Sequence, residues 1–309
     1  MKFFSPILTS HFTLLTSHVL MLNLASLCFP DQEKSCFYCC PPIRAPEADP
    51  LDNIEAKLQL LRTNRKELQK NLNNPREISG EECWGLGFLD DQERQAGCLL
   101  HPLRHQGRDL RHLTGYQFKC ANALCREAQV FAQLSQTEQT FCLALCRGMD
   151  SIHYSSRRNP LMRLLAWEEE IVQIIVRESL KNRADKFQNL ILNNFLSDYE
   201  FLWQKLDFRL DGYLVLQIAE KKRLSFLRRN RENYIELREA LIVDLKHNLK
   251  PQITPAADLL PAHKLKIPLN LSRLLKFGAS LWELPSNCEA EIEQLIEPKL
   301  TGFCHLHNH

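Results

Sequence analysis

Hydrophobic residues spaced three or four positions apart recur along most of this chain and predict helices. The first such series runs from Ile54 to Leu72. Asp52 stands where an N-cap belongs, Glu55 follows three residues later, and Pro75 is expected to end the series. The sequence therefore predicts one amphipathic helix between Asp52 and Pro75.

The second half of the chain carries further helix boundaries. Three pairs of residues mark helix starts: Ser135 with Glu138, Asn159 with Pro160, and Ser197 with Glu200. The predicted helices are one ending near Gly148, one from Pro160 through Leu180, one from Ser197, one from about Lys221 to Leu249, and two short ones, Leu269–Phe277 and Ala290–Leu295. Leu206–Ala219 is ambiguous, because Asp211 and Gly212 between apolar runs are typical of a hairpin whereas the flanks look helical.

Changes in this pattern favour a mainly α fold, with an irregular cysteine-rich metal-binding region that contains some helices and a helical C-terminal region after it. Residues 76–119 combine several glycines with little periodicity, so we expect irregular loops there. The expected segments are a signal-like or mis-assigned N-terminal extension (1–27), the cysteine-rich region (28–150), a helical domain (151–250), and a connector with the C-terminal tail (251–309).

Residues 1–27 are apolar, and Lys2 is their only charge. This resembles the start of an export signal, but the run is diluted by polar residues and no small-x-small cleavage site is clear. Met21 offers a second possible start of translation. We expect a cytoplasmic protein, with export as the alternative, and no transmembrane segment in the mature chain.

The overall charge gives no attraction to polyanions, since 39 basic residues face 37 acidic ones in a chain of 309 residues. A basic run from Lys221 to Arg231 enters a predicted helix and could contact phosphates. No nucleic-acid motif accompanies it, so we interpret it as a solvated face and do not expect nucleic acid as a partner.

Cysteines carry the clearest chemical pattern. The chain has twelve, and nine of them fall between Cys36 and Cys146. Disulfides in an oxidising compartment and inert core thiols are the alternatives, but clustered thiolates in a reducing compartment favour zinc or an iron–sulfur cluster. The candidate ligands are Cys36, Cys39, Cys40, Cys83, Cys98, His101, Cys120 and Cys125.

The surroundings of these residues separate ligands from other thiols. Glycine or proline beside Cys83, Cys98 and His101 allows the sharp turns that a metal site needs. Cys142 and Cys146 lie four residues apart on an apolar helix face, where packing is the better interpretation. Alternating histidines in the tail, His305, His307 and His309, form at most an adventitious site.

The cysteine segment resembles the bacterial family described as zinc- or iron-chelating cysteine-cluster domains. The matching positions are Cys36, Cys39 and Cys40; Cys83 with Phe88 and Leu89; Gly97 with Cys98 and His101; and Cys120. The match covers about residues 28–126 and lacks the family's Arg-Pro-x-x-Cys-Arg step. The resemblance implies metal chelation without naming a reaction.

Common catalytic motifs are absent from the sequence: it has no His-Glu-x-x-His zincin motif, phosphate loop, Gly-x-Ser-x-Gly or dinucleotide fingerprint. We therefore expect a metal-binding protein rather than an enzyme. One alternative is a helical interaction or regulatory protein with structural cysteines, whose partner protein binds residues 160–250. The other is an iron–sulfur redox enzyme.

Overall fold

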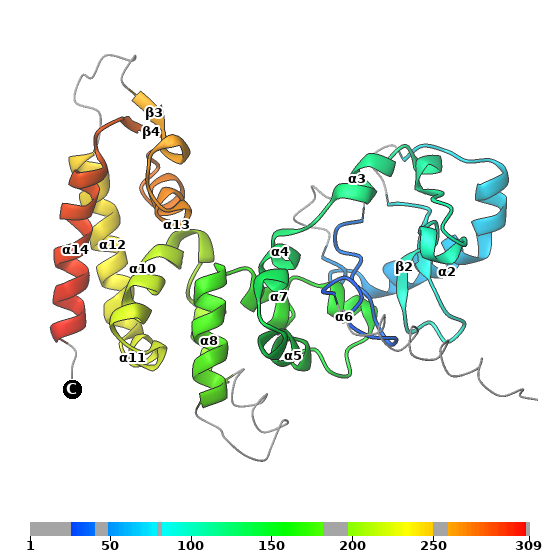
Figure 1. Cartoon of the computed structure of the whole chain (residues 1–309), viewed down its shortest axis with the longest axis horizontal. Helices are drawn as coiled ribbons and strands as arrows, with labels where there is room; N and C mark the ends of the chain where they lie inside the picture. Colours follow the sequence, from blue (N-terminus) through cyan, green and yellow to red (C-terminus); the bar gives the residue numbers. More distant parts are fainter. Residues whose placement is uncertain (1–25, 41–48, 79–81, 182–196, 250–258, 307–309) are drawn as a thin grey trace, which may run out of the picture. The chain divides into compact units, whose positions relative to one another are not determined.

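The computed structural model describes residues 26–40, 49–78, 82–181, 197–249 and 259–306. These residues are mainly helical and contain two small antiparallel sheets of two strands each (Figure 1), so the predicted mainly α fold is confirmed. None of the helices within these ranges is long and apolar enough to cross a membrane. The chain divides into two compact units: unit one (residues 1–128 and 148–157) and unit two (residues 129–147 and 158–309).

Unit one contains one long helix and several short elements. They are the helices α2 (Ile54–Asn73), α3 (Gln117–Asn122) and α6 (Ser151–Ser155), the strands β1 (Leu86–Phe88) and β2 (Ala96–Cys98), and the 3-10 helices η1 (Pro102–Arg104) and η2 (Arg111–Thr114). Helix α4 (Arg126–Gln133) begins in unit one and ends in unit two.

Helix α2 begins one residue beyond its predicted cap. The Asn53 side chain accepts the N–H of Ala56, which makes Asn53 and not Asp52 the N-cap. Asn and Asp cap helices about equally well, so the sequence alone could not choose between these neighbours. The predicted end before Pro75 is confirmed, since the helix stops at Asn73.

Strands β1 and β2 form a hairpin within 76–119, where irregular loops were expected, and that prediction was wrong. Leu86 pairs with Cys98, and Phe88 pairs with Ala96. Both faces of β1 are buried, so its sequence has no alternation of apolar and polar residues to reveal a strand. Gly87 fits because a Cβ there would lie 3.2 Å from the Leu61 carbonyl oxygen of α2.

The core of unit one lies between α2 and the hairpin. Its buried side chains come from the N-terminal loop, α2, the hairpin and its flanks, and α6: Phe37, Leu61, Ile78, Cys83, Trp84, Leu86, Phe88, Ala96, Leu100 and Ile152. Cys40 and Cys98 pack against this cluster. Two of the predicted ligands therefore lie at the edge of the same core that buries a third, Cys83.

Helix α6 ties the N-terminal loop to the hairpin through buried hydroxyls. The Ser151 Oγ accepts the N–H groups of Ser35 (3.1 Å) and Ala96 (3.0 Å) and donates to the Arg94 carbonyl (3.1 Å). The Tyr154 hydroxyl donates to the Leu27 carbonyl at 2.7 Å. These bonds satisfy buried backbone groups of the N-terminal loop and of the hairpin.

Unit two is a set of helices with one small sheet. Its described elements are α5 (Gln136–Ala144), α7 (Pro160–Leu165), α8 (Glu169–Lys181), a helix at 197–204, α10 (Phe208–Lys221), α11 (Leu224–Arg229), α12 (Arg231–Asn248), β3 (Leu259–Pro261), η4 (Ala262–Lys264), α13 (Leu269–Arg273), the π-helical η5 (Leu274–Gly278), β4 (Glu283–Pro285) and α14 (Glu289–Leu306). Strands β3 and β4 pair antiparallel, and α12 packs along α14 (Figure 1).

Local capping residues define several of these helices. Ser135 and Glu138 form the predicted capping box of α5, and the Asn159 side chain accepts the N–H of Met162 ahead of Pro160 in α7. The helix predicted through Leu180 is instead interrupted between α7 and α8. The short helix predicted at Ala290–Leu295 extends in the structure to Leu306, with Pro298 inside it.

The ambiguous segment Leu206–Ala219 is helical in the structure, as α10. Asp211, which suggested a turn, is fully buried there. Its carboxylate accepts the Tyr234 hydroxyl at 2.6 Å and lies 3.2 Å from an Arg238 nitrogen. Burial raises the pKa of the Asp211 carboxyl, and the bonds from Tyr234 and Arg238 oppose that shift. Asp211 and Gly212 thus lie in a helix and not in a hairpin turn, because Asp211 pairs with Tyr234 and Arg238 of α12.

We predict that Arg238→Met destabilises unit two by about 3–5 kcal/mol, because it leaves the buried Asp211 carboxylate without its cation. Arg231→Met is the control: Arg231 lies on the same helix, is half exposed and reaches Glu232 only at 3.9 Å. That change should stay within about 0.5 kcal/mol. Denaturant unfolding of both variants measures the difference, and equal losses would contradict the assignment.

Candidate metal centre

Cys83 and Cys98 lie at the same end of the hairpin. Cys98 is the last residue of β2 and pairs with Leu86, the first residue of β1. The Cys83 carbonyl accepts the N–H of Leu86 at 3.0 Å, which closes a turn immediately before β1. The hairpin therefore holds two thiols side by side at its open end.

The side chain of Asn64, on α2, holds this turn through two hydrogen bonds. Its buried side-chain nitrogen donates to the carbonyl oxygens of Cys83 (3.1 Å) and Leu86 (2.8 Å). The donor comes from the polar-looking sequence of α2, where an asparagine among charged residues gave no sign of burial. The position of Cys83 thus depends on the side-chain amide of Asn64, which lies 19 residues earlier in the chain.

Cys40 and Cys120 reach the same region from two other segments. The Lys119 Nζ donates to the carbonyl oxygen of Cys39, which brings α3 beside the Cys39–Cys40 pair. Arg111, held by Asp109 at 2.8 Å, donates to the Cys120 carbonyl at 2.8 Å. We call Cys40, Cys83, Cys98 and Cys120 the hairpin thiols.

A second set of thiols gathers around the N-terminal loop. The Cys36 N–H donates to the Cys28 carbonyl at 2.9 Å and closes the loop between them. Arg157 stacks on the Tyr38 ring at 4.0 Å and pairs with Glu127, next to the start of α4. We call Cys28, Cys36, Cys39 and Cys125 the loop thiols.

The thiols of this region raise one another's pKa values, an effect that extends over about 10 Å and so does not require the sulfurs to be in contact. Every pair of loop thiols interacts in this way: Cys36 with Cys28, Cys39 and Cys125, Cys28 with Cys39, and Cys125 with Cys28 and Cys39. Among the hairpin thiols every pair interacts except Cys40 with Cys120. Between the sets, Cys39 interacts with Cys40 and Cys120.

Burial keeps most of these thiols protonated. It raises the pKa of Cys36 and of Cys98 to about 12 and that of Cys83 to about 11, and the charges of neighbouring thiols add to the effect. The pKa values of Cys28, Cys40, Cys120 and Cys125 are raised for the same reason. Such thiols are poor nucleophiles, and they ionise readily only when a cation binds them.

A backbone N–H group is directed at the Cys83 sulfur: the Gly85 N–H donates to the Cys83 Sγ at 3.3 Å. The backbone N–H groups of Tyr38, Leu100 and Ala128 lower the pKa values of Cys36, Cys98 and Cys125, against the larger effect of burial.

Positive side chains lie beside both sets. Lys119 lowers the pKa values of Cys40, Cys83 and Cys120 against the larger effect of burial, and Arg111 does so for Cys98 and Cys120. Arg157 has this effect on Cys125. Each set of thiols therefore has its own source of compensating charge.

His101 has other neighbours. Its Nδ1 accepts the N–H of Leu103 at 3.3 Å and caps η1, and its ring lies 6.1 Å from that of Phe29. Burial and Arg111 lower the pKa of its imidazole. The imidazole ring of His101 thus contacts the Leu103 N–H and the Phe29 ring.

The remaining cysteines are separate from this region. Cys142 and Cys146 are fully buried in unit two. Cys288 and Cys304, also in unit two, are almost fully buried. All twelve cysteines are free thiols. His307 and His309 lie outside the described residues. Across the described ranges, no three His, Cys, Asp or Glu side chains converge closely enough to hold a metal ion as they stand.

Cys28 is the neighbour that sequence reasoning missed. It lies eight positions before Cys36 and was not among the candidate ligands. The backbone bond from Cys36 that brings it into the loop set leaves no mark in the sequence.

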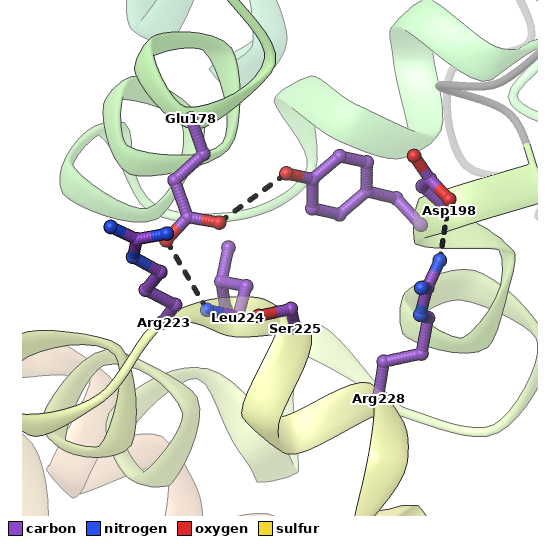
Figure 2. Close-up of a pocket in the computed structure, with 7 residues that line it drawn as sticks. Glu178, Asp198, Arg223, Leu224, Ser225 and Arg228 are labelled. Carbon is purple, nitrogen blue, oxygen red and sulfur yellow. Dashed lines mark hydrogen bonds and ion pairs between the residues drawn. The ribbon is translucent and has the colours of Figure 1, made fainter. Parts of the chain in front are cut away.

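A polar pocket of about 390 Å³ in unit two is the other candidate site (Figure 2). The Glu178 carboxylate there accepts the Leu224 N–H at 3.2 Å and the Tyr199 hydroxyl at 3.5 Å. Arg228 of the basic run pairs with Asp198, and Lys221 pairs with Glu297. Because acidic partners neutralise these cations, the run gives little support to a phosphate-binding role.

Comparison with models of protein families, with curated proteins and with solved structures found no match to this chain. The resemblance of residues 28–126 to the cysteine-cluster family therefore stays a prediction. What supports a function is the arrangement of side chains in unit one.

We predict that Asn64→Ala lowers the free energy of unfolding by about 1–3 kcal/mol, because two buried carbonyls lose their donor. Asn73→Ala, at the exposed end of the same helix, is the control and should cost less than about 0.5 kcal/mol. Chemical denaturation measures both. If Asn64→Ala behaves like the control, α2 does not hold the Cys83 turn.

Proposed function

We propose that this chain is a metal-binding protein whose thiolates in unit one hold zinc or an iron–sulfur cluster. The observation that carries the proposal is the placement of Cys83 and Cys98 at the open end of the hairpin, where Cys40 packs against the same core and the Gly85 N–H donates to the Cys83 Sγ at 3.3 Å. Such bonds orient thiolate ligands and spread their negative charge. A thiol that serves only as a small apolar residue has no need of them.

The charge balance supports the same proposal. Four thiolates around one Zn²⁺ leave a net charge of about −2, which is costly to bury without compensation. Lys119, Arg111 and Arg157 lie where they reduce that cost. Arg111 and Lys119 also donate to backbone carbonyls of cysteines, so their positions are fixed by the same segments that present the thiols.

The donor set fits soft metals. Thiolate ligands select zinc, copper(I) or iron–sulfur clusters over magnesium or calcium, which require oxygen donors. We assign no ligand role to His101, because its Nδ1 is used in capping η1. A redox role would follow only from an iron–sulfur cluster, and a helical partner-binding role has no comparable cluster of side chains behind it.

Metal content tests the proposal. Protein purified without oxygen and reconstituted with zinc, or with iron and sulfide, should retain a stoichiometric metal after gel filtration, and a visible spectrum distinguishes a cluster from zinc. Cys98→Ala should lose bound metal and lower the thermal midpoint, since metal binding supplies folding free energy. Cys142→Ala is the matched control, with metal retained and a loss of about 1 kcal/mol. Retention of all metal by Cys98→Ala would contradict the proposal.

Metal uptake should release protons, because raised pKa values keep metal-free thiols such as Cys36 and Cys98 protonated near pH 7. Protons compete with the metal, so apparent affinity should rise with pH. Calorimetric titration at pH 7 in two buffers of different ionisation enthalpy counts the protons. Binding without proton release would mean that the ligands are not these thiols.

A further inference from the structure

We propose that a groove between α12 and β4 in unit two binds a second copy of this chain, and that the resulting dimer has a twofold axis. This inference is independent of the proposed metal binding, since the thiols of unit one take no part in it. The groove has a volume of about 640 Å³. Its lining residues include Val243, Lys246 and His247 of α12 and Ser280, Trp282 and Glu283 after η5. We call it the α12–β4 groove.

Large apolar side chains are exposed in and beside this groove. Val243 is 63% exposed and Trp282 is 57% exposed, although both line it. The ring of Phe277, itself 47% exposed, meets the Trp282 ring edge to face with the centroids 6.0 Å apart. Apolar surface of this kind favours contact with another surface that removes it from water. Aromatic residues are also enriched at the centres of protein–protein interfaces.

The backbone holds Trp282 in one position. The chain leaves the π-helical η5 through the Leu281 N–H, which donates to the Leu275 carbonyl at 2.9 Å. The Trp282 carbonyl accepts the Ala262 N–H at 2.8 Å. Between them Ser280 has a φ of 57°, in the left-handed region that favours glycine. π-helical turns and residues in this conformation are frequent at binding sites. A tryptophan fixed in advance loses little conformational freedom when a partner binds.

The walls of the groove favour a macromolecule over a small ligand. Five of the lining side chains, Val243, Lys246, His247, Trp282 and Glu283, are exposed. Sites for small molecules bury most of the surface of the ligand. A hollow whose walls are themselves in water cannot do so, and it fits the surface of a folded chain better.

The charges of the groove select the partner. Lys246 on α12 and Glu283 at the start of β4 both line it, and neither forms an ion pair with another described residue. A partner with charges of one sign would therefore meet a like charge. A second copy related by a twofold axis places Lys246 of each copy opposite Glu283 of the other, so that both contacts join opposite charges.

The oligomeric state of the full chain tests the inference. Under reducing conditions, which prevent disulfides between copies, light scattering after gel filtration should give twice the chain mass of 36.0 kDa, with dissociation on dilution. Trp282→Ala should raise the dissociation constant of the dimer at least about tenfold, because aromatic anchors carry much of the binding energy. Phe118→Ala, at a ring of unit one that is 84% exposed, is the control and should leave the constant unchanged. A wild type that stays monomeric up to about 1 mM would overturn the inference.

Exchange of the two charges tests the twofold axis. Lys246→Glu and Glu283→Lys each place like charges opposite each other at both contacts, and each should weaken the dimer about tenfold. Equal amounts of the two variants should associate with each other, and the double variant should associate with itself, because opposite charges then face again. Lys266→Glu, at an exposed lysine outside the groove lining, should leave the dimer intact. A mixture that associates no better than either variant alone would contradict this pairing.

Tryptophan fluorescence of the unaltered chain gives a second readout. Trp84 and Trp167 are buried and Trp203 is half-buried, so acrylamide should quench mainly Trp282 in the monomer. Quenching should decrease as the protein concentration rises and the dimer forms. Weak quenching in a monomer would mean that another segment of the same chain covers the ring. Unchanged quenching on dimer formation would mean that the interface lies elsewhere, and either result overturns the inference.

Discussion

The buried Ser151 hydroxyl is the contact on which the arrangement of unit one depends. Its oxygen accepts hydrogen bonds from one N–H group of the N-terminal loop and one of β2, and its O–H donates a hydrogen bond to the Arg94 carbonyl. The Ser155 hydroxyl repeats the pattern by accepting the Phe37 N–H at 3.0 Å. Loops without a ladder must place their polar backbone groups somewhere, and these short side chains provide the partners. The loop that carries Cys36 and Cys39 is positioned by them.

Given that frame, the chemistry of the thiols follows from burial. Burial raises the pKa values of thiols such as Cys36, Cys83 and Cys98, so these thiols lie in the same unit without repulsion between charges. Lys119 and Arg111 act in the opposite direction, because a nearby cation favours the ionised form of a thiol.

The sequence predicted what depends on local chemistry. Ser135 with Glu138 and Asn159 with Pro160 cap their helices through bonds spanning three residues, so spacing alone reveals them. The pool of candidate cysteines was visible for a similar reason, since glycine and proline lie beside them. The hairpin was not visible, because three-residue strands buried on both faces show no alternation.

Long-range contacts determine the features that the sequence did not predict. Nothing near Asp211 in sequence shows that Tyr234 and Arg238 would hold it inside a helix. Cys28 could not be recognised as a member of its set until the loop was closed by Cys36.

The chain passes between its two units more than once, and this limits where it can be divided into fragments. Residues 129–147 leave unit one for unit two, and residues 148–157 return with α6 before the chain departs again. Any single cut from residue 128 to residue 157 leaves at least one unit without part of its sequence. A fragment ending at residue 128 would lack Ser151 and Ser155, and with them the partners of the N-terminal loop. A fragment that keeps all of unit one must extend to residue 157, and it then carries residues 129–147 of unit two with it.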